Sequence, residues 1–205
     1  MKSIWDFIPA RAEVGVGLVL SQKGRYIFFL AGERHHCPGG ELFYAGLGGH
    51  LEKGETLLEA AQREAWEEIG VRIKVISAEQ TYHLPPTAEP RLVECWDFPR
   101  PLALYEMIHP PGTPRAGQLY HIVVLLACLL DYPAELKRDE VGAVIALTEE
   151  QLITNLNKKL TLQELLAGGA KLIAGGEDLN RTTVLYPLGT ARALALILLL
   201  IFDSP

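Results

Sequence analysis

The feature that most constrains this chain is the segment 49–71, GHLEKGETLLEAAQREAWEEIGV, in which a glycine-opened loop leads into a helix. Spacings of three and four residues return to the same side of a helix. Glu64, Glu67 and Glu68 are therefore predicted to share one face. An adjoining apolar stripe, suited to packing on a sheet, is formed by Leu58, Ala61, Ala65 and Ile69.

The same helix carries residues that would orient its acidic face and end it. Arg63 lies four residues from both Glu59 and Glu67, a spacing that allows ion pairs on a helix surface. Gly70 is expected to end the helix, because glycine readily adopts the left-handed conformation of a C-terminal cap.

Three carboxylates on one helical face repel each other unless something compensates their charge. Carboxylate oxygens suit hard divalent cations, and Mg²⁺ typically binds a few carboxylates together with the phosphates of a substrate. A solvated acidic face is the alternative interpretation of such a cluster. The pattern thus indicates either a Mg²⁺ or Mn²⁺ site or an ordinary acidic surface.

This segment resembles the Nudix box, G-x5-E-x7-R-E-U-x-E-E-x-G-U, in which U is a bulky apolar residue. Ala65 is smaller than the usual residue at the first apolar position, a departure that concerns packing. A weaker resemblance extends over residues 12–155. All the fixed positions match in register: Gly49, Glu55, Arg63, Glu64, Glu67, Glu68 and Gly70.

The resemblance implies hydrolysis of a nucleoside diphosphate joined to another moiety, by water attack at phosphorus. The implied cofactor is Mg²⁺ or Mn²⁺, and the substrate is a small molecule. The implied metal ligands are the backbone carbonyl of Gly49 and the side chains of Glu64, Glu67 and Glu68.

The resemblance also implies roles for residues around the metal. Glu55 and Arg63 would orient the loop and the helix. Glu64 is the leading candidate for the general base. Some relatives use a loop glutamate instead, and Glu140 is the candidate for that role here, with an ordinary solvated charge pair as the alternative.

Two classes of function stay open. The first is a diphosphohydrolase acting on a nucleotide sugar, an ADP-ribose-like compound, a dinucleotide or a nucleoside triphosphate. The second is a nucleotide-binding regulatory Nudix module with little or no turnover. The intact glutamate set favours the enzyme, because a pure binder has no need of it. Isomerase chemistry on a diphosphate-linked compound is a weaker third option, since nothing marks the additional Cys and Glu roles it requires.

The implied fold is α/β: a Nudix-type α/β/α sandwich with a mixed β-sheet and a C-terminal helical extension. We divide the chain into a Nudix domain, 1–155, and an extension, 156–205, that packs on the domain or on a partner subunit. Patterns of branched and alternating residues predict strands at 13–21, 25–31, 43–48, 72–80, 102–108, 118–131 and 141–147. Helices are expected near 149–152, at 161–167 and from 189 or 190.

A proline-rich region, 83–117, holds eight of the thirteen prolines and cannot be a continuous helix or a central strand. We expect long loops around the one short strand there. Aromatic side chains could stack on a base and arginines could hold phosphate; packing of the loops against the core is the alternative. The candidate substrate-binding residues are Trp96, Phe98, Tyr105 and Arg115.

Composition bounds the partners and the location. A net charge of −6 argues against a nucleic acid polymer as the partner. Three widely spaced cysteines and the lack of an apolar signal core predict a cytoplasmic protein. The apolar run 193–202 is too short to span a bilayer. We expect a buried helix or one shared in a homodimer, with a membrane-surface anchor as the alternative.

Two histidine patterns carry weaker hypotheses. The adjacent His35, His36 and Cys37 suggest zinc, but such a site needs about four ligands and no second cluster is evident. A loop at the mouth of the pocket is the preferred interpretation. His121, inside a predicted central strand, is interpreted as a core residue rather than a catalytic one.

Overall fold

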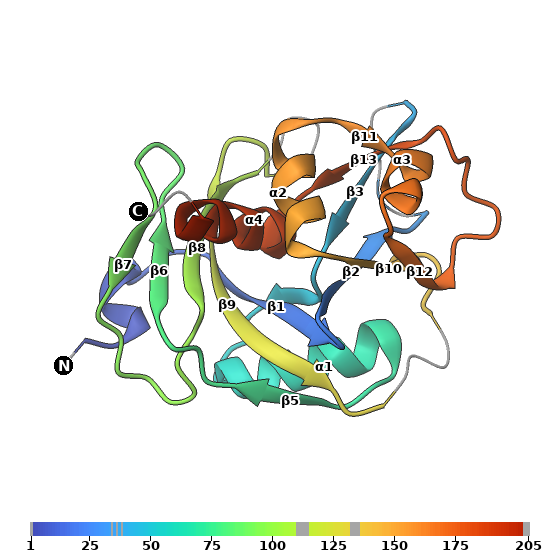
Figure 1. Ribbon diagram of the computed structural model, residues 1–205. Helices are drawn as coiled ribbons and strands as arrows, with labels where there is room; N and C mark the ends of the chain where they lie inside the picture. Colours follow the sequence, from blue (N-terminus) through green and yellow to red (C-terminus); the bar gives the residue numbers. More distant parts are fainter. Residues whose placement is uncertain are drawn as a thin grey trace.

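The computed structural model describes residues 2–33, 35, 37, 39–109, 115–131 and 136–202. The helices in these ranges are η1 (Ile4–Phe7), α1 (Leu57–Ile69), α2 (Glu149–Asn157), α3 (Leu162–Ala167) and α4 (Gly189–Phe202). A mixed sheet separates α1 from α2 and α4, so the chain forms the expected α/β/α sandwich (Figure 1).

The sheet is built around the parallel pair formed by the first strand and the long ninth strand. The described strands are β1 (Val14–Gln22), β2 (Arg25–Ala31), β3 (Glu41–Ala45), β4 (Gly48–His50), β5 (Ile73–Ile76), β6 (Thr81–Leu84), β7 (Arg91–Val93), β8 (Ala103–Ile108), β9 (Leu119–Leu129), β10 (Val141–Leu147), β11 (Leu160–Thr161), β12 (Lys171–Gly175) and β13 (Val184–Pro187). Their order is β11-β13-β3-β2-β1-β9-β8-β6-β7, with β10 paired to β2 and β12, β4 to β1, and β5 to β9. The central strands are buried along most of their length, as expected of a strand with both faces covered.

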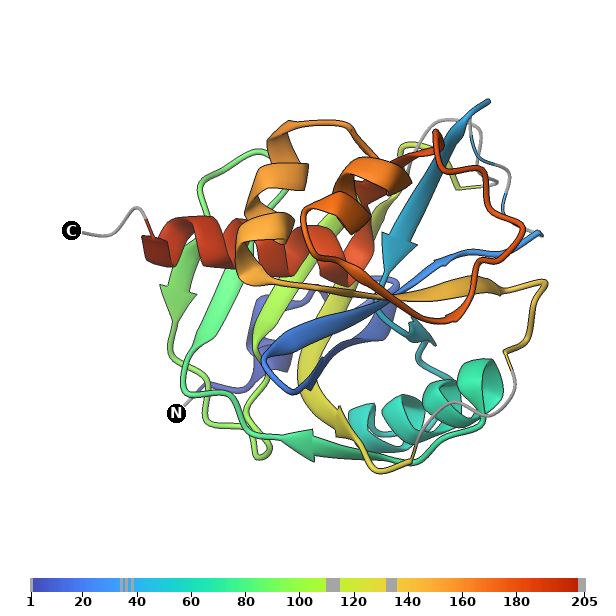
Figure 2. The ribbon, with the colours of Figure 1, turned by 45° about the vertical axis from the view of Figure 1, so that its right-hand side comes forward.

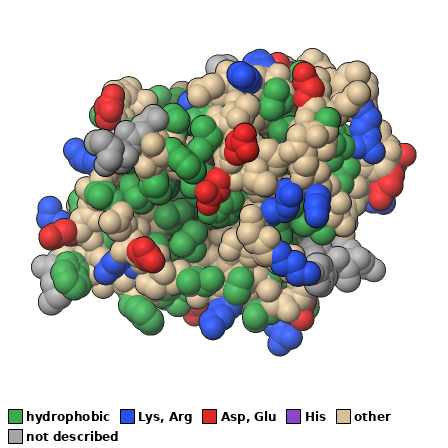
Figure 3. All heavy atoms as spheres, viewed as in Figure 1, with side chains coloured by type: hydrophobic (Ala, Val, Ile, Leu, Met, Phe, Trp, Pro, Cys, Tyr) green, Lys and Arg blue, Asp and Glu red, His purple; other side chains and the backbone are tan. Residues whose placement is uncertain are grey.

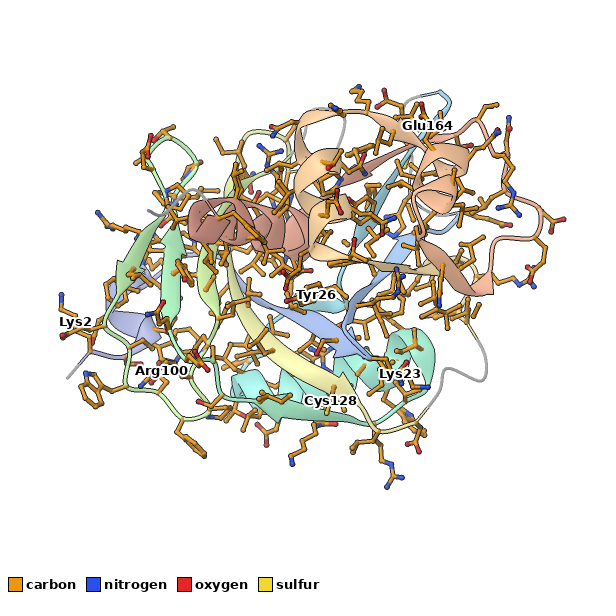
Figure 4. All side chains as sticks on the ribbon, in the orientation of Figure 1. Lys2, Lys23, Tyr26, Arg100, Cys128 and Glu164 are labelled. Carbon is orange, nitrogen blue, oxygen red and sulfur yellow. The ribbon has the colours of Figure 1, made fainter. Side chains whose placement is uncertain are left out.

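The strands predicted at 13–21 and 25–31 are observed as β1 and β2, which form an antiparallel hairpin. Lys23 and Gly24 both have positive φ, 51° and 74°. Two-residue turns of this kind match the right-handed twist of the flanking strands. On the same strand, the Tyr26 hydroxyl, labelled in Figure 4, donates to Glu149 Oε1 at 3.2 Å, which ties β2 to the start of α2.

Each face of the sheet has its own apolar core. One core joins the sheet to α2, α3 and α4, and the other joins it to α1 and η1. In α1, Ala61, Ala65 and Ile69 are buried as predicted, and Ala60 is buried with them. The prediction for Leu58 is wrong: it is exposed, because the first turn of α1 borders an open hollow lined by Phe98 and Pro99 rather than the sheet.

The ends of α1 follow from its cap residues. Thr56 accepts from the Glu59 N–H at 3.3 Å, and the Glu59 carboxylate accepts from the Thr56 N–H at 2.8 Å. This reciprocal pair is a capping box. The capping box engages the Glu59 carboxylate, which we expected to pair with Arg63. Gly70 has φ 63° and ends the helix, as predicted.

The proline-rich region is more ordered than the sequence indicated. The prediction of loops around one strand is wrong, because β6 begins just before this region and β7 and β8 lie within it. Pro85, Pro86 and Pro90 all fall in the connection between β6 and β7, so they leave the strand pairing intact. The register joins Tyr82 to Leu92.

The segment after residue 155 is interleaved with the rest of the chain. Besides the predicted helices, it contributes β13, which pairs in parallel with β3, and β12, which pairs with β10. Figure 2 shows α2, α3 and α4 grouped on one side of the sheet. The separation of this segment as a domain at residue 155 stays a prediction.

The last helix packs into its own chain. Seven of its residues are buried, including Ala191, Leu194 and Leu198, and Ile201 and Phe202 at its end are exposed. Hydrophobic side chains gather in the centre of the face where α4 crosses the sheet (Figure 3). Within the described ranges, no helix is both long and apolar enough to cross a membrane.

Candidate active site

The site is centred where β4 meets α1. Gly49 pairs with Val16 of β1, and the Glu64 carboxylate lies directly against the Gly49 backbone. A Cβ at position 49 would overlap Glu64 Oε1, Cδ and Oε2. Only glycine therefore lets the backbone and this carboxylate approach so closely, and the two predicted residues are adjacent.

Arg63 links the loop to the helix. Its guanidinium donates to both oxygens of Glu55, at 2.8 and 3.0 Å, and to Glu64 Oε1 at 2.7 Å. It also donates to Glu67 Oε2 at 3.3 Å and to the His50 carbonyl at 3.1 Å. These bonds, those to Glu55 foremost, raise the pKa of Arg63 further. In turn, the Arg63 hydrogen bonds lower the pKa of Glu55.

Glu68 lies beside Glu64 and accepts weakly from the Gly48 N–H, at 3.4 Å. Burial raises the pKa of Glu68 to about 8, and the negative charges of Glu64 and Glu140 raise it as well. Glu140, placed just before β10, pairs with Lys137 at 2.7 Å. Three of the acidic residues singled out in the sequence therefore share one region.

Glu67 is not part of that group, since its exposed side chain turns toward Arg63. In the part of the chain that the structure describes, no group of three or more His, Cys, Asp or Glu side chains is placed to hold a metal ion.

The zinc hypothesis concerned His35, His36 and Cys37. His36 lies outside the described residues, and the His35 ring packs edge-on against Phe43, with 5.1 Å between the ring centroids. His121 is buried in β9, as predicted.

The donor set nevertheless fits a hard divalent cation. Two adjoining carboxylates, Glu64 and Glu68, lie beside the Gly49 backbone, and oxygen donors of these types suit Mg²⁺ or Mn²⁺. No lysine or arginine pairs with Glu68 among the described residues. A cation would offset the burial and repulsion that raise the Glu68 pKa. Glu67 would join the set by turning away from Arg63.

Of the four candidate substrate residues, the structure brings one to the site. Arg115 pairs with Glu13 and contacts His50 Nε2 at 2.7 Å, next to Gly49. Tyr105 is buried, with its phenol near Arg192.

The other two aromatic candidates lie elsewhere on the surface. Trp96 is 59% exposed and lines a hollow of about 320 Å³ with Arg100, which Figure 4 labels near β6. Phe98 is 91% exposed beside the first turn of α1. Neither lines the cavity beside Gly49, which is bordered by Met107, Tyr120, Ile122 and Thr190.

The sequence interpretation missed an aromatic stack at this cavity. The Tyr120 ring lies between His50, at 4.8 Å between ring centroids, and His109, at 5.4 Å. Burial and the charge of Glu64 raise the pKa of Tyr120, and Arg115 opposes this shift. Burial and the nearby His50 lower the pKa of His109. The only signal in the sequence was alternation along β9, which places Tyr120 and His121 on opposite faces.

Comparison with known proteins then identifies the family. A family model described as the NUDIX domain matches residues 10–165. The chain belongs to the Nudix family. This membership confirms the family and the α/β fold class predicted from the sequence. It also supports the prediction that the chain is a diphosphohydrolase (pyrophosphatase). Nudix hydrolases generally use divalent metal ions.

Two curated relatives are similar to this chain over a short segment of 57 residues. The NAD-capped RNA hydrolase NudC of Chromobacterium violaceum is 46% identical over 57 residues, covering 28% of this chain and 20% of the relative. The NudC of Haemophilus influenzae strain Rd is 40% identical over 57 residues, covering 28% and 21%. The chain thus matches only about a fifth of the length of these relatives.

Solved Nudix structures are more distant. A NUDIX hydrolase from Nitrosomonas europaea is 16% identical, with a TM-score of 0.47, covering 70% of this chain and 77% of that one. A UDP-X diphosphatase is 13% identical, with a TM-score of 0.49, covering 96% and 66%. At these TM-scores, neither structure adds to the assignment.

Proposed function

We propose that this Nudix protein is a metal-dependent diphosphohydrolase that cleaves the diphosphate linkage of a nucleoside diphosphate joined to another moiety, by water attack at phosphorus. The observation that carries the proposal is the contact of the Gly49 backbone with the Glu64 carboxylate, next to Glu68 with its raised pKa. A glycine backbone and carboxylates in this arrangement would hold a divalent cation, which would neutralise charge on a diphosphate.

In this proposal, the cation is Mg²⁺ or Mn²⁺ and is held by Gly49, Glu64, Glu67 and Glu68. A bound cation supplies charge neutralisation for the diphosphate and activation of the attacking water. The residues of the chain do the rest. Arg63, bonded to Glu55 through both carboxylate oxygens, fixes the loop against the helix and keeps Glu64 in place.

The general base is either Glu64 or Glu140. Glu64 is held by Arg63 at 2.7 Å, which fixes the position of its carboxylate. Glu140 is close enough to Glu68 for its charge to raise the Glu68 pKa, and it is paired with Lys137. Glu64→Gln and Glu140→Gln separate the two, because replacement of the base removes the dependence of kcat on the ionisation of that group.

The test is a substrate panel incubated with Mg²⁺ or Mn²⁺, with release of a nucleoside monophosphate as the readout. The panel holds NAD, ADP-ribose, a UDP-sugar, a dinucleoside polyphosphate and nucleoside triphosphates. An NAD-capped RNA oligonucleotide belongs in it, because two relatives carry that activity in their names. In ¹⁸O-labelled water, one product phosphate should carry the label, as attack at phosphorus requires.

Variants of the glutamates test the metal assignment. Glu67→Gln and Glu68→Gln should each lower kcat by orders of magnitude while the urea midpoint stays close to that of the wild type. Glu52→Gln is the matched control, since Glu52 is exposed and bonds to Glu55 through its backbone N–H and carbonyl, which the substitution keeps. Full activity of either site variant would show that the metal assignment is wrong. Binding of several panel compounds without cleavage would favour a regulatory module.

The cellular setting is part of the proposal. Cys37, Cys95 and Cys128 are free thiols, which suits the reducing cytoplasm. A homodimer stays a prediction, supported by the exposed Ile201 and Phe202 at the end of α4. Sedimentation at micromolar concentration, with Phe202→Ser as the variant, measures it.

A further inference from the structure

The cavity beside the predicted metal ligands contains a polar group that the proposed mechanism does not use. Tyr120, on β9, is 7% exposed and lines a cavity of about 140 Å³ with Gly48, Gly49 and Thr190. No hydrogen bond from its hydroxyl to another residue is observed within the described ranges. The hydroxyl therefore has a proton to donate to a ligand in this cavity that accepts a hydrogen bond.

The hydroxyl lies close to the centre of the site. The Tyr120 hydroxyl and the Gly49 carbonyl oxygen both occupy the space that a Cβ at Gly15 would need. Gly15 is opposite His50 on one side and Ile122 on the other, so the absence of a side chain there lets β4 and β9 bring these two oxygens together.

The position of the ring is fixed from both sides. His50 and His109 stack on its two faces, with interplanar angles of 24° and 23°. The His109 N–H donates to the Gln118 carbonyl at 2.9 Å, and the Gly117 N–H donates to the His109 carbonyl at 3.0 Å, which ties the His109 backbone to the residues just before β9. A donor held this rigidly needs little reorganisation when a ligand arrives.

The neighbouring groups indicate what the ligand is. The Gly49 carbonyl and the Glu64 carboxylate are acceptors, so a hydroxyl between them and the cavity is the donor that an incoming oxyanion would meet. Arg115, which contacts His50 Nε2 at 2.7 Å, adds positive charge at the same edge. A diphosphate oxygen fits this combination of donors.

We propose that Tyr120, clamped between His50 and His109, is a substrate-binding residue that donates a hydrogen bond to a diphosphate oxygen beside Gly49. The inference rests on the proposed function for the identity of the ligand. It adds a donor outside the segment 49–71, on a strand that pairs in parallel with β1.

The experiment measures binding without turnover. The probe is α,β-methylene-ADP, whose phosphates are joined by carbon, titrated calorimetrically in the presence of Mg²⁺. Tyr120→Phe keeps the ring and removes only the hydroxyl, and it should weaken probe binding about tenfold to hundredfold, as expected for a lost hydrogen bond to a charged group. Tyr82→Phe is the matched control, because it removes a hydroxyl from another buried tyrosine, on β6, whose partner is Gln80; its affinity should equal that of the wild type.

A second readout separates ligand binding from effects on the metal or the fold. Mn²⁺ affinity without nucleotide and the thermal midpoint should be the same in Tyr120→Phe and the wild type. Equal probe affinities in these two proteins would overturn the inference, and so would weaker Mn²⁺ binding in the variant, which would mean that Tyr120 acts through the metal. Probe binding that depends on Tyr120, without cleavage of any panel compound, would reject the hydrolase proposal alone.

Discussion

Gly49→Ala is the most informative single substitution, because it adds one methyl group at the centre of the site. The added Cβ would lie 2.6 Å from Glu64 Cδ and 2.9 Å from Oε2, and closer still to Oε1. Glu64 is buried and held by Arg63 at 2.7 Å, so it can withdraw only by giving up that bond. The backbone itself tolerates alanine, since Gly49 is not among the glycines with positive φ.

The expected magnitude follows from these contacts. Overpacking of a filled site typically costs about 1–3 kcal/mol, and we expect a loss of stability in that range. A displacement of a catalytic group by about 1 Å can lower the rate on the order of 10²-fold, so kcat/KM should fall by at least that factor. Urea unfolding and steady-state kinetics on the cleaved panel compound measure the two effects.

A control and a double mutant test the reasoning. Gly39→Ala should change stability by no more than about 0.5 kcal/mol, because no atom of the described residues beyond its chain neighbours lies within 4 Å of a Cβ there. Glu64→Ala should relieve the overlap, so that Gly49→Ala costs less stability in its presence, with a coupling of about 0.5–3 kcal/mol. Strictly additive stability effects, or a fully active Gly49→Ala enzyme, would refute the argument.

Two further predictions concern the supports of the site and of the fold. Arg63→Lys should cost about 1–3 kcal/mol and lower kcat/KM, because a single ammonium cannot keep the two-pronged bond to Glu55 and the bond to Glu64; equal urea midpoints would contradict this. Hydrogen bonds from the Thr161 backbone and hydroxyl lower the pKa of Glu164 from its ordinary 4.5. The ionised Glu164 carboxylate therefore contributes its full stabilisation of the folded state above about pH 4.5. This contribution is lost as the pH falls through the pKa of Glu164 in the folded state. The stability difference between Glu164→Gln and the wild type should shrink in acid, and a constant difference from pH 7 to pH 3 would argue against it.

The elements predictable from the sequence are those whose signals are local. The glutamate spacing and Gly70 predicted α1, and the helix expected at 161–167 is α3, which begins with a capping box of Thr161 and Glu164. The same capping signature at Thr56 and Glu59 could have been found from the sequence, and would have shown that Glu59 was not available to Arg63. The short strands β6 and β7 were missed because each has only three or four residues next to a proline and is stabilised by pairing with the other.

The parts of the site that could not be predicted depend on contacts between distant residues. His50, His109 and Tyr120 come from three separate strands or connections. The pairings of β4 with β1, β1 with β9 and β8 with β9 bring them together. For the same reason, the sequence offered no basis for choosing among the candidate aromatic residues. Trp96 and Phe98 follow β7, which lies next to β6 at the edge of the sheet. They therefore line hollows other than the cavity beside Gly49.

The central claim is that the acidic face of α1 holds a divalent cation beside Gly49. Anomalous diffraction from crystals soaked in Mn²⁺ tests it most directly. We predict one peak bounded by the Gly49 carbonyl and by Glu64 and Glu68, with Glu67 turned toward it from its present contact with Arg63. Crystals without a peak at this position, and with Glu64, Glu67 and Glu68 unchanged at saturating Mn²⁺, would contradict the account.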